Sequence, residues 1–145
     1  MHPLEGIRQY TGKEFTGTPS HFMKWLKPVV LTVEEGKLVF QYHVRKEMTN
    51  PMGTLHGGVT AAIVDDLIGA TLFSYGEEHF YTTLNIVVDY FSPAKEGDDI
   101  VAETKLIKKG NQLVNVQCEV HNSDRSKLIA RGYSNLLKTN IKKNI

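Results

Sequence analysis

The sequence lacks several features that mark specialised classes of protein. It contains one cysteine among 145 residues, which excludes an internal disulfide framework and a cysteine-based zinc site. Its formal net charge is +1, whereas nucleic-acid-binding domains usually present a strongly basic face. No apolar run approaches the roughly 18 residues of a membrane span, and the first residues begin no secretory signal. These absences favour a cytoplasmic protein that binds neither nucleic acid nor membrane.

The composition is typical of one soluble domain. Apolar residues make up 41% of the chain and charged residues 23%, an ordinary balance for a globular protein. A chain of this length can bury about two-thirds of its unfolded surface as a single domain, residues 1–145. Cys118 falls on an alternating strand pattern and is expected in the core. His43, His79 and His121 have no metal-site spacing, so we expect no metal and no cofactor.

The hydrophobic pattern predicts one long helix over 57–75, because the run there is apolar and contains no proline. A short helix over 21–27 is expected inside an N-terminal arm, 1–28, with Ser20 as its cap. Residues 139–145 form a polar tail. Six stretches rich in β-branched and aromatic residues, bounded by turn signals, predict strands: 29–34, 37–44, 80–91, 100–108, 113–121 and 127–137. One long helix with a meander of strands indicates an α+β domain whose sheet is largely antiparallel.

The stretch from Asn50 to Asp66 has the strongest indication of chemistry. A glycine pair, Gly57-Gly58, forms the first turn of the apolar helix, and unshielded N–H groups at a helix N-terminus favour a developing negative charge. Two turns later Asp65 and Asp66 are the only charges in the helix, where an ionised group is costly unless it is paired or used. Amide donors followed by a carboxylate are typical of acyl transfer. A satisfied ion pair at a subunit contact is the alternative.

Two blocks of this sequence resemble the hotdog-fold acyl-CoA thioesterases, the type that includes the phenylacetate-degradation thioesterase and the animal thioesterase superfamily proteins. The first is His56-Gly57-Gly58, followed after six residues by Asp65; the second is Thr83-Leu-Asn-Ile-Val-Val-Asp-Tyr-Phe-Ser-Pro93. With the strands after them they cover roughly 29–138. The resemblance implies an antiparallel sheet wrapped around one central helix. It also implies hydrolysis of an acyl-CoA to a free acid and coenzyme A by a homodimer or homotetramer, with the active site across a dimer interface.

Asp65 and Asp66 lie about 100° apart on a helix, so only one can point squarely into a given site. The local sequence does not choose between them, but the family spacing selects Asp65. An ordinary aspartate is ionised at neutral pH, so Asp65 is expected to take a proton from water or to attack the thioester directly. Asp66 is assigned to an ion pair or to a helix–sheet hydrogen bond.

Four further residues match the family's active site. The N–H of Gly57 is the expected oxyanion donor, and His56 either polarises the carbonyl or only orients the loop. Asn50 either holds the carbonyl or the water, or simply forms an Asn-Pro turn. Thr83 aligns with a hydroxyl residue that positions water in similar enzymes, and Thr82 competes with it if the register slips by one residue.

The resemblance also places the substrate. Five residues at strand and turn positions resemble the family's nucleotide-facing edge and are expected to contact coenzyme A: Lys108, Lys109, Gly110, Arg131 and Gly132. The acyl pocket is expected to be apolar, drawn from the N-terminal arm and from Leu55, Val59, Ile63 and Leu84. Two alternatives stay open, a non-catalytic acyl-CoA sensor and a hotdog dehydratase. Asp65 argues against the sensor, and the absence of the dehydratase helix pattern argues against the dehydratase.

Overall fold

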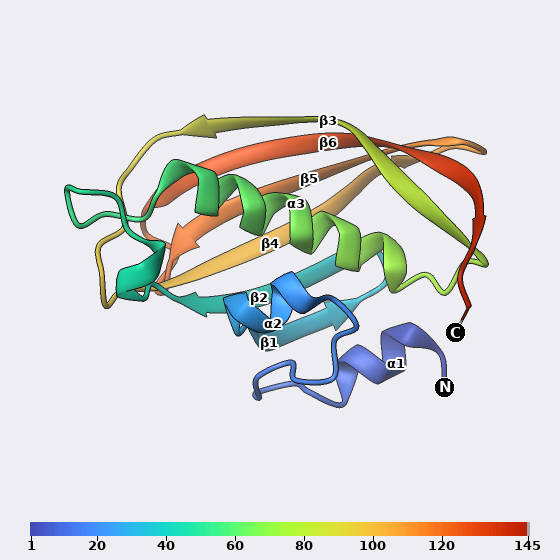
Figure 1. The fold of residues 1–145 in the computed structure, drawn as a ribbon, viewed down its shortest axis with the longest axis horizontal. Coiled ribbons are helices and arrows are strands. Elements are labelled where there is room, and N and C mark those ends of the chain that lie inside the picture. The colour runs from blue at the N-terminus through green and yellow to red at the C-terminus, as the bar shows by residue number, and fades with distance from the viewer. Residues whose placement is uncertain (145) are drawn as a thin grey trace.

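The computed structural model describes residues 1–144, in which a six-stranded antiparallel sheet curls around one long helix, α3 (Figure 1). The strands are β1 (Val29–Glu34), β2 (Lys37–His43), β3 (His79–Tyr90), β4 (Asp99–Lys109), β5 (Leu113–Asn122) and β6 (Leu128–Lys142). Their order in the sheet is β1-β2-β4-β5-β6-β3, so β1 and β3 form its two edges. The predicted α+β hotdog architecture, an antiparallel sheet around one central helix, is confirmed.

Helix α3 (Gly57–Phe73) packs its apolar residues against the concave face of the sheet. A buried hydrogen bond ties it to β4, because the hydroxyls of Thr71 and Thr104 lie 2.6 Å apart. The contact with β6 depends on Gly132. A Cβ at that position would lie 2.5 Å from the carbonyl oxygen of Val87 and 3.2 Å from a methyl group of Val64. Glycine at this point therefore lets β3, β6 and α3 approach closely.

The N-terminal arm contains one helix more than the sequence predicted. Residues 1–18, which show no clear periodicity, include a helix, α1 (Pro3–Arg8), with a proline in its first turn. The arm is held in place by the burial of Ile7 and Phe15. The short helix α2 (His21–Leu26) forms as predicted, and the side chain of Ser20 caps it by accepting a 3.1 Å hydrogen bond from the Met23 amide.

Strand β6 extends further than predicted. It continues to Lys142, so 139–142 of the predicted tail lie in the strand, where Lys142 is opposite His79 of β3. The ladder between β3 and β6 has an irregularity between Thr83 and Asn85. The extra residue of such a bulge shifts the alternation of side chains by one position in the rest of the strand.

Three remaining findings concern single features. A 3₁₀ turn, η1 (Lys46–Met48), leads into the loop before α3. Cys118 is buried, and burial raises the pKa of its thiol to about 12, so its predicted place in the core is confirmed. No helix in residues 1–144 is both long and apolar enough to cross a membrane.

Candidate active site

The first turn of α3 presents hydrogen-bond donors to solvent. Gly57 is the first helical residue, so its N–H has no partner within the helix. His56 caps the helix, and its Nδ1 accepts a 2.9 Å hydrogen bond from the Gly58 amide. In a neutral ring the proton then lies on Nε2, because one imidazole nitrogen donates when the other accepts. The exposed side of His56 is thus a donor next to the Gly57 amide.

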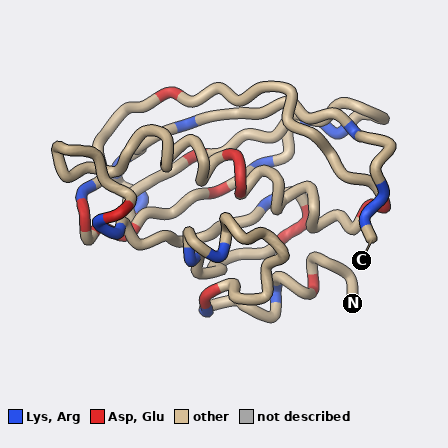
Figure 2. Tube along the Cα trace, viewed as in Figure 1, with Lys and Arg blue, Asp and Glu red and all other residues tan. Residues whose placement is uncertain are grey.

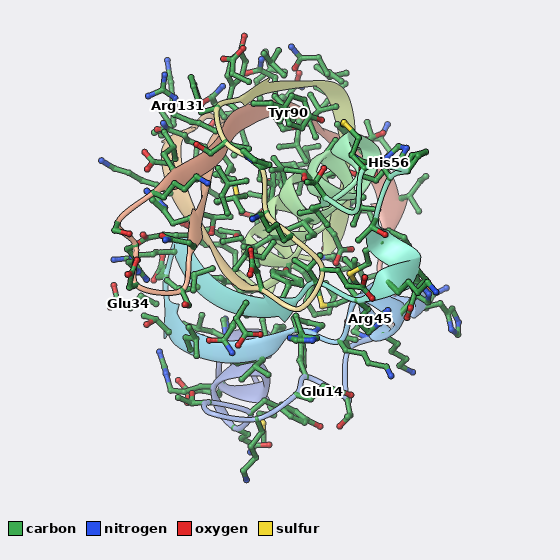
Figure 3. All side chains as sticks on the ribbon, turned by 90° about the vertical axis from the view of Figure 1, so that its left-hand side faces the viewer. Glu14, Glu34, Arg45, His56, Tyr90 and Arg131 are labelled. Atoms are coloured by element: carbon green, nitrogen blue, oxygen red, sulfur yellow. The ribbon has the colours of Figure 1, made fainter. Side chains whose placement is uncertain are left out.

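Tyr90 supports this turn from the end of β3. Its hydroxyl donates a 2.6 Å hydrogen bond to the carbonyl oxygen of Gly57, and a Cβ built at Gly57 would lie 3.5 Å from the tyrosine ring. Figure 3 shows Tyr90 and His56 at the same end of the molecule. No signal in the sequence indicates this role of Tyr90, although the residue lies inside the second family-like block.

Asn50 is engaged within its own loop. Its Oδ1 accepts hydrogen bonds from the amides of Met52 at 3.0 Å and Thr54 at 3.2 Å, and its Nδ2 donates to the Thr54 hydroxyl at 2.9 Å. This is the side-chain pattern of an Asx turn. In this conformation Asn50 shapes the loop that leads to His56.

Asp65 and Thr83 are brought together by the structure. The Thr83 hydroxyl donates a 3.3 Å hydrogen bond to Oδ1 of Asp65, and both side chains are exposed. Residues 83 and 90 would face opposite sides of a regular strand, since side chains alternate. The bulge after Thr83 removes this conflict, so that Thr83 and Tyr90 both reach α3.

Asp66 has a different environment from its neighbour, although the two form a single acidic stretch on α3 (Figure 2). One oxygen is 3.5 Å from the Ser20 hydroxyl of the arm, and Oδ2 has no hydrogen-bond partner among residues 1–144. Burial, and then the charge of Asp65, raise the pKa of Asp66 to about 6. The predicted ion pair or helix–sheet hydrogen bond is absent from the part of the chain described. The one contact of this carboxylate links α3 to the arm instead.

A cavity of about 310 Å³ opens next to these carboxylates. Asp65, Asp66 and Thr83 lie on its wall. The remaining lining is mostly apolar and comes from the arm, the second half of α3 and the facing strands, including Ile7, Phe15, Met23, Leu72, Phe73 and Phe80. Lys143 also lines it, with its ammonium 4.8 Å from the centre of the Phe73 ring and 5.7 Å from that of Phe80.

The residues predicted for an acyl pocket agree with this cavity only in part. The N-terminal arm contributes to the lining, as expected. Leu55 and Ile63 are instead buried in the core, and Val59 packs against it. Leu84 is the bulge residue of β3 and is 54% exposed. The sequence therefore predicted the wall that the arm forms. The wall formed by α3 lies further along the helix than expected.

The predicted oxyanion donor and the predicted catalytic carboxylate lie far apart along α3. Gly57 and Asp65 are eight residues apart on one straight helix, a distance of about 12 Å along its axis. An oxyanion donor and a catalytic carboxylate must both lie about 3 Å from the atoms that react. One subunit therefore does not bring Gly57 and its own Asp65 to the same carbonyl.

The five residues predicted to contact coenzyme A do not form one cluster. Lys109 pairs with Glu77, and its ammonium lies 5.1 Å from the centre of the Tyr75 ring, while Lys108 is exposed on β4. The guanidinium of Arg131 lies 5.7 Å from the Phe91 ring centre, and Figure 3 places Arg131 well away from His56. Gly110 lies in the β4–β5 turn, where its amide donates to the Leu113 carbonyl at 2.9 Å. Gly132 serves the close packing described above.

Clusters of three or more His, Cys, Asp or Glu side chains suitable for a metal ion do not occur within residues 1–144.

Comparison with known proteins identifies the family. The model of the thioesterase superfamily matches residues 52–129, more than half of the chain. Human acyl-coenzyme A thioesterase 13 is 34% identical over 106 residues, which are 73% of this chain and 76% of that protein. Zebra fish thioesterase superfamily member 2 superposes with a TM-score of 0.77 at 26% identity, over 93% and 94% of the two chains. The E. coli PaaI protein has the same fold, with a TM-score of 0.80 at 18% identity over 95% and 96% of the chains. The chain therefore belongs to the thioesterase superfamily, as a hotdog-fold thioester hydrolase.

Proposed function

We propose that this protein hydrolyses acyl-CoA thioesters at a site that two subunits share, with Gly57 from one subunit and Asp65 from the other. The acyl-CoA part of the proposal is supported by the 34% identity to human acyl-coenzyme A thioesterase 13. The observation that carries the site is the Thr83–Asp65 pair, which lies exposed on the wall of a largely apolar cavity. A thioester with its carbonyl beside this pair can extend its acyl group into the cavity.

The shared site follows from distance and from the open edge of the sheet. A separation of about 12 Å keeps Gly57 away from Asp65 of the same chain. Pairing of two β3 edges about a two-fold axis would set two α3 helices antiparallel, and the proposal requires a register that brings the start of one near the middle of the other. Natural sheet edges are usually paired or covered, and β3 has an unpaired outer side in residues 1–144. We therefore expect a dimer as the smallest active unit, with a tetramer as a dimer of such dimers.

The chemistry assigns one task to each group. A water molecule held by Thr83 gives a proton to the Asp65 carboxylate while its oxygen bonds to the thioester carbon. The resulting oxyanion accepts a hydrogen bond from the Gly57 N–H, whose donor strength the helix dipole increases, and from Nε2 of His56. Collapse of the intermediate breaks the C–S bond, and the coenzyme A thiolate leaves and takes up a proton. Direct attack by Asp65 would use the same donors and form an anhydride, which water then cleaves.

Replacement of Asp65 by asparagine tests this proposal, because it keeps the shape of the side chain and removes its charge. Turnover of an acyl-CoA panel, read by thiol release, is expected to fall by about 10²–10⁴-fold. Asp66→Asn is the matched control on the adjacent residue and is expected to cost far less. A wild type that binds acyl-CoA in calorimetry but hydrolyses no thioester would instead make the protein a sensor. Loss of activity in Asp66→Asn but not in Asp65→Asn would transfer the catalytic role to Asp66.

The contacts to coenzyme A are a separate part of the proposal. Lys108 is exposed and forms no ion pair within residues 1–144, so its ammonium can bind a phosphate, whereas the charge of Lys109 is partly neutralised by Glu77. Arg131 is the other cation of the predicted set. We expect Lys108→Ala and Arg131→Ala to raise KM by a few-fold with little change in kcat, since a phosphate far from the carbonyl is bound equally in ground and transition states. An unchanged KM in both variants would mean that the nucleotide of coenzyme A binds at another place on the protein.

A further inference from the structure

Helix α3 contains a glycine that packing within this chain does not explain. Gly69 lies in the helix interior, where glycine is less favourable than alanine. It is exposed, although the residues just before and after it on the helix are mostly buried. A Cβ built at Gly69 meets no atom within 4 Å, in contrast to the clash that a Cβ would make at Gly132. The presence of glycine at position 69 therefore needs another explanation.

The open space above Gly69 belongs to the cavity beside the catalytic carboxylate. Gly69 follows Asp65 by four residues, so the two positions are neighbours on one face of the helix. Both residues line the cavity, and the apolar Leu72 and Phe73 continue its wall one turn further on. A side chain at 69 would stand between Asp65 and this apolar end. Its absence leaves a continuous passage along α3.

The length and volume of the passage limit what can fill it. Asp65 and Phe73 are eight residues apart, or about 12 Å along the helix. An extended alkyl chain with C–C bonds of about 1.5 Å needs roughly nine or ten carbons to cover that distance. The cavity volume of about 310 Å³ is within the range of small-molecule sites and leaves room for such a chain.

We propose that Gly69 determines acyl-chain specificity by admitting an unbranched chain of about eight to ten carbons, whose methyl end contacts Phe73 and Phe80. These two rings and Lys143, whose ammonium lies 4.8 Å from the centre of the Phe73 ring and 5.7 Å from that of Phe80, form the far part of the lining. A short aryl-acetyl group would leave the apolar end unfilled. This inference rests on the proposed function, since it requires the thioester carbonyl to lie beside Asp65.

The test compares chain-length profiles of kcat/KM, read by thiol release from butyryl-, decanoyl-, tetradecanoyl- and phenylacetyl-CoA. Wild type is expected to prefer decanoyl-CoA. Gly69→Val places a branched side chain in the passage, so decanoyl-CoA turnover is expected to fall about tenfold or more while butyryl-CoA turnover changes little. Gly6→Val is the matched control, because Gly6 of α1 also has nothing within 4 Å of its built Cβ but lies outside the cavity. Its profile is expected to match that of wild type.

A second variant works in the opposite direction. Phe73→Ala removes the end wall, so the preference is expected to shift from decanoyl- towards tetradecanoyl-CoA. Both readouts are ratios within one protein sample, which cancels losses of folded protein. A wild-type profile in both Gly69→Val and Phe73→Ala, or a wild type that prefers butyryl- or phenylacetyl-CoA, overturns this inference and leaves the proposed function standing. A wild type that hydrolyses none of the four thioesters overturns the proposed function itself.

Discussion

The two edges of the sheet differ in how they are protected. The arm covers the β1 edge, where Gly12 donates a 2.7 Å hydrogen bond to the Val30 carbonyl and the Val30 amide donates to Lys13 at 3.0 Å. The β3 edge has no such cover within residues 1–144. It exposes a row of large apolar side chains, namely Phe80, Leu84, Ile86, Val87 and Tyr90. Exposed edges invite pairing with another chain. The chain thus closes one edge by itself, whereas the other edge, next to Thr83 and Tyr90, stays open in residues 1–144, and we propose that a second subunit covers it.

The largest expected effect comes from a charge on the open edge. Leu84→Asp puts a carboxylate on a residue that is 54% exposed in the single chain but buried if two β3 strands pair. We expect light scattering to show dissociation to monomers. Turnover should fall by about 10²-fold or more, since in the proposed shared site a separated subunit has no oxyanion donor beside its carboxylate.

Leu31→Asp is the control on the covered edge, where Leu31 of β1 is 37% exposed. We expect it to keep both the assembly and the turnover of the wild type. If the Leu84→Asp variant remains a dimer with full activity, β3 is not part of the subunit interface. Dissociation in both variants would mean that the two edges do not differ in this way.

The next effect concerns the turn of α3 that lies against the end of the open edge. Gly57→Val adds a branched side chain whose Cβ would be in contact with the Tyr90 ring at 3.5 Å, so its two methyl groups are expected to crowd the turn. The resulting displacement of the Gly57 amide is expected to lower kcat by an order of magnitude or more, with little change in coenzyme A affinity. Thiol release and calorimetry on the same samples measure the two quantities. An unchanged kcat in Gly57→Val would mean that the Gly57 amide has no role in the mechanism.

The smallest expected effect is a change in stability. It comes from Asp66, which contacts the arm that covers the β1 edge. The pKa of Asp66 is about 6 in the folded protein, above its usual value, so the folded state binds more protons than the unfolded state between about pH 4 and 6. Stability therefore falls as pH rises through that window. Asp66→Asn removes the cost of burying an ionised carboxylate. It is therefore expected to raise the free energy of unfolding by about 2 kcal/mol at pH 7–8 and to leave it unchanged near pH 3. Denaturant unfolding at the two pH values measures the difference, and equal stabilities at pH 7–8 would contradict it.

Much of the fold was predictable because its signals are local. Strand 29–34 and the start of α3 at Gly57 were predicted to the residue, from a hairpin signal and a glycine pair that follows a loop. Helix α1 was missed because only Ile7 of its residues is buried, too few to show a period. The extension of β6 to Lys142 was missed for another reason, because polar residues there pair with a strand about 60 positions earlier.

For the candidate site, the sequence provides the spacing of the residues but not their contacts. The family spacing selected Asp65, and the structure gives it the hydroxyl of Thr83, not of Thr82, because a bulge follows residue 83. No local pattern indicates that bulge. The contact of Asp66 with Ser20, 46 residues away, likewise depends on how the arm folds back. Tyr90 was overlooked because a tyrosine at a strand end is read first as a packing residue.

The most direct test of a site shared by two subunits is complementation between two inactive variants. Gly57→Val and Asp65→Asn chains are unfolded, mixed in equal amounts and refolded together, and thiol release is measured against each variant refolded alone. If the site combines Gly57 of one subunit with Asp65 of the other, each hybrid dimer has one site with both native residues, and the mixture recovers about a quarter of wild-type activity. If each subunit held a complete site, every site in the mixture would contain one lesion. Activity no higher than that of the separate variants, in mixtures where mass spectrometry detects hybrid dimers, would contradict the shared site.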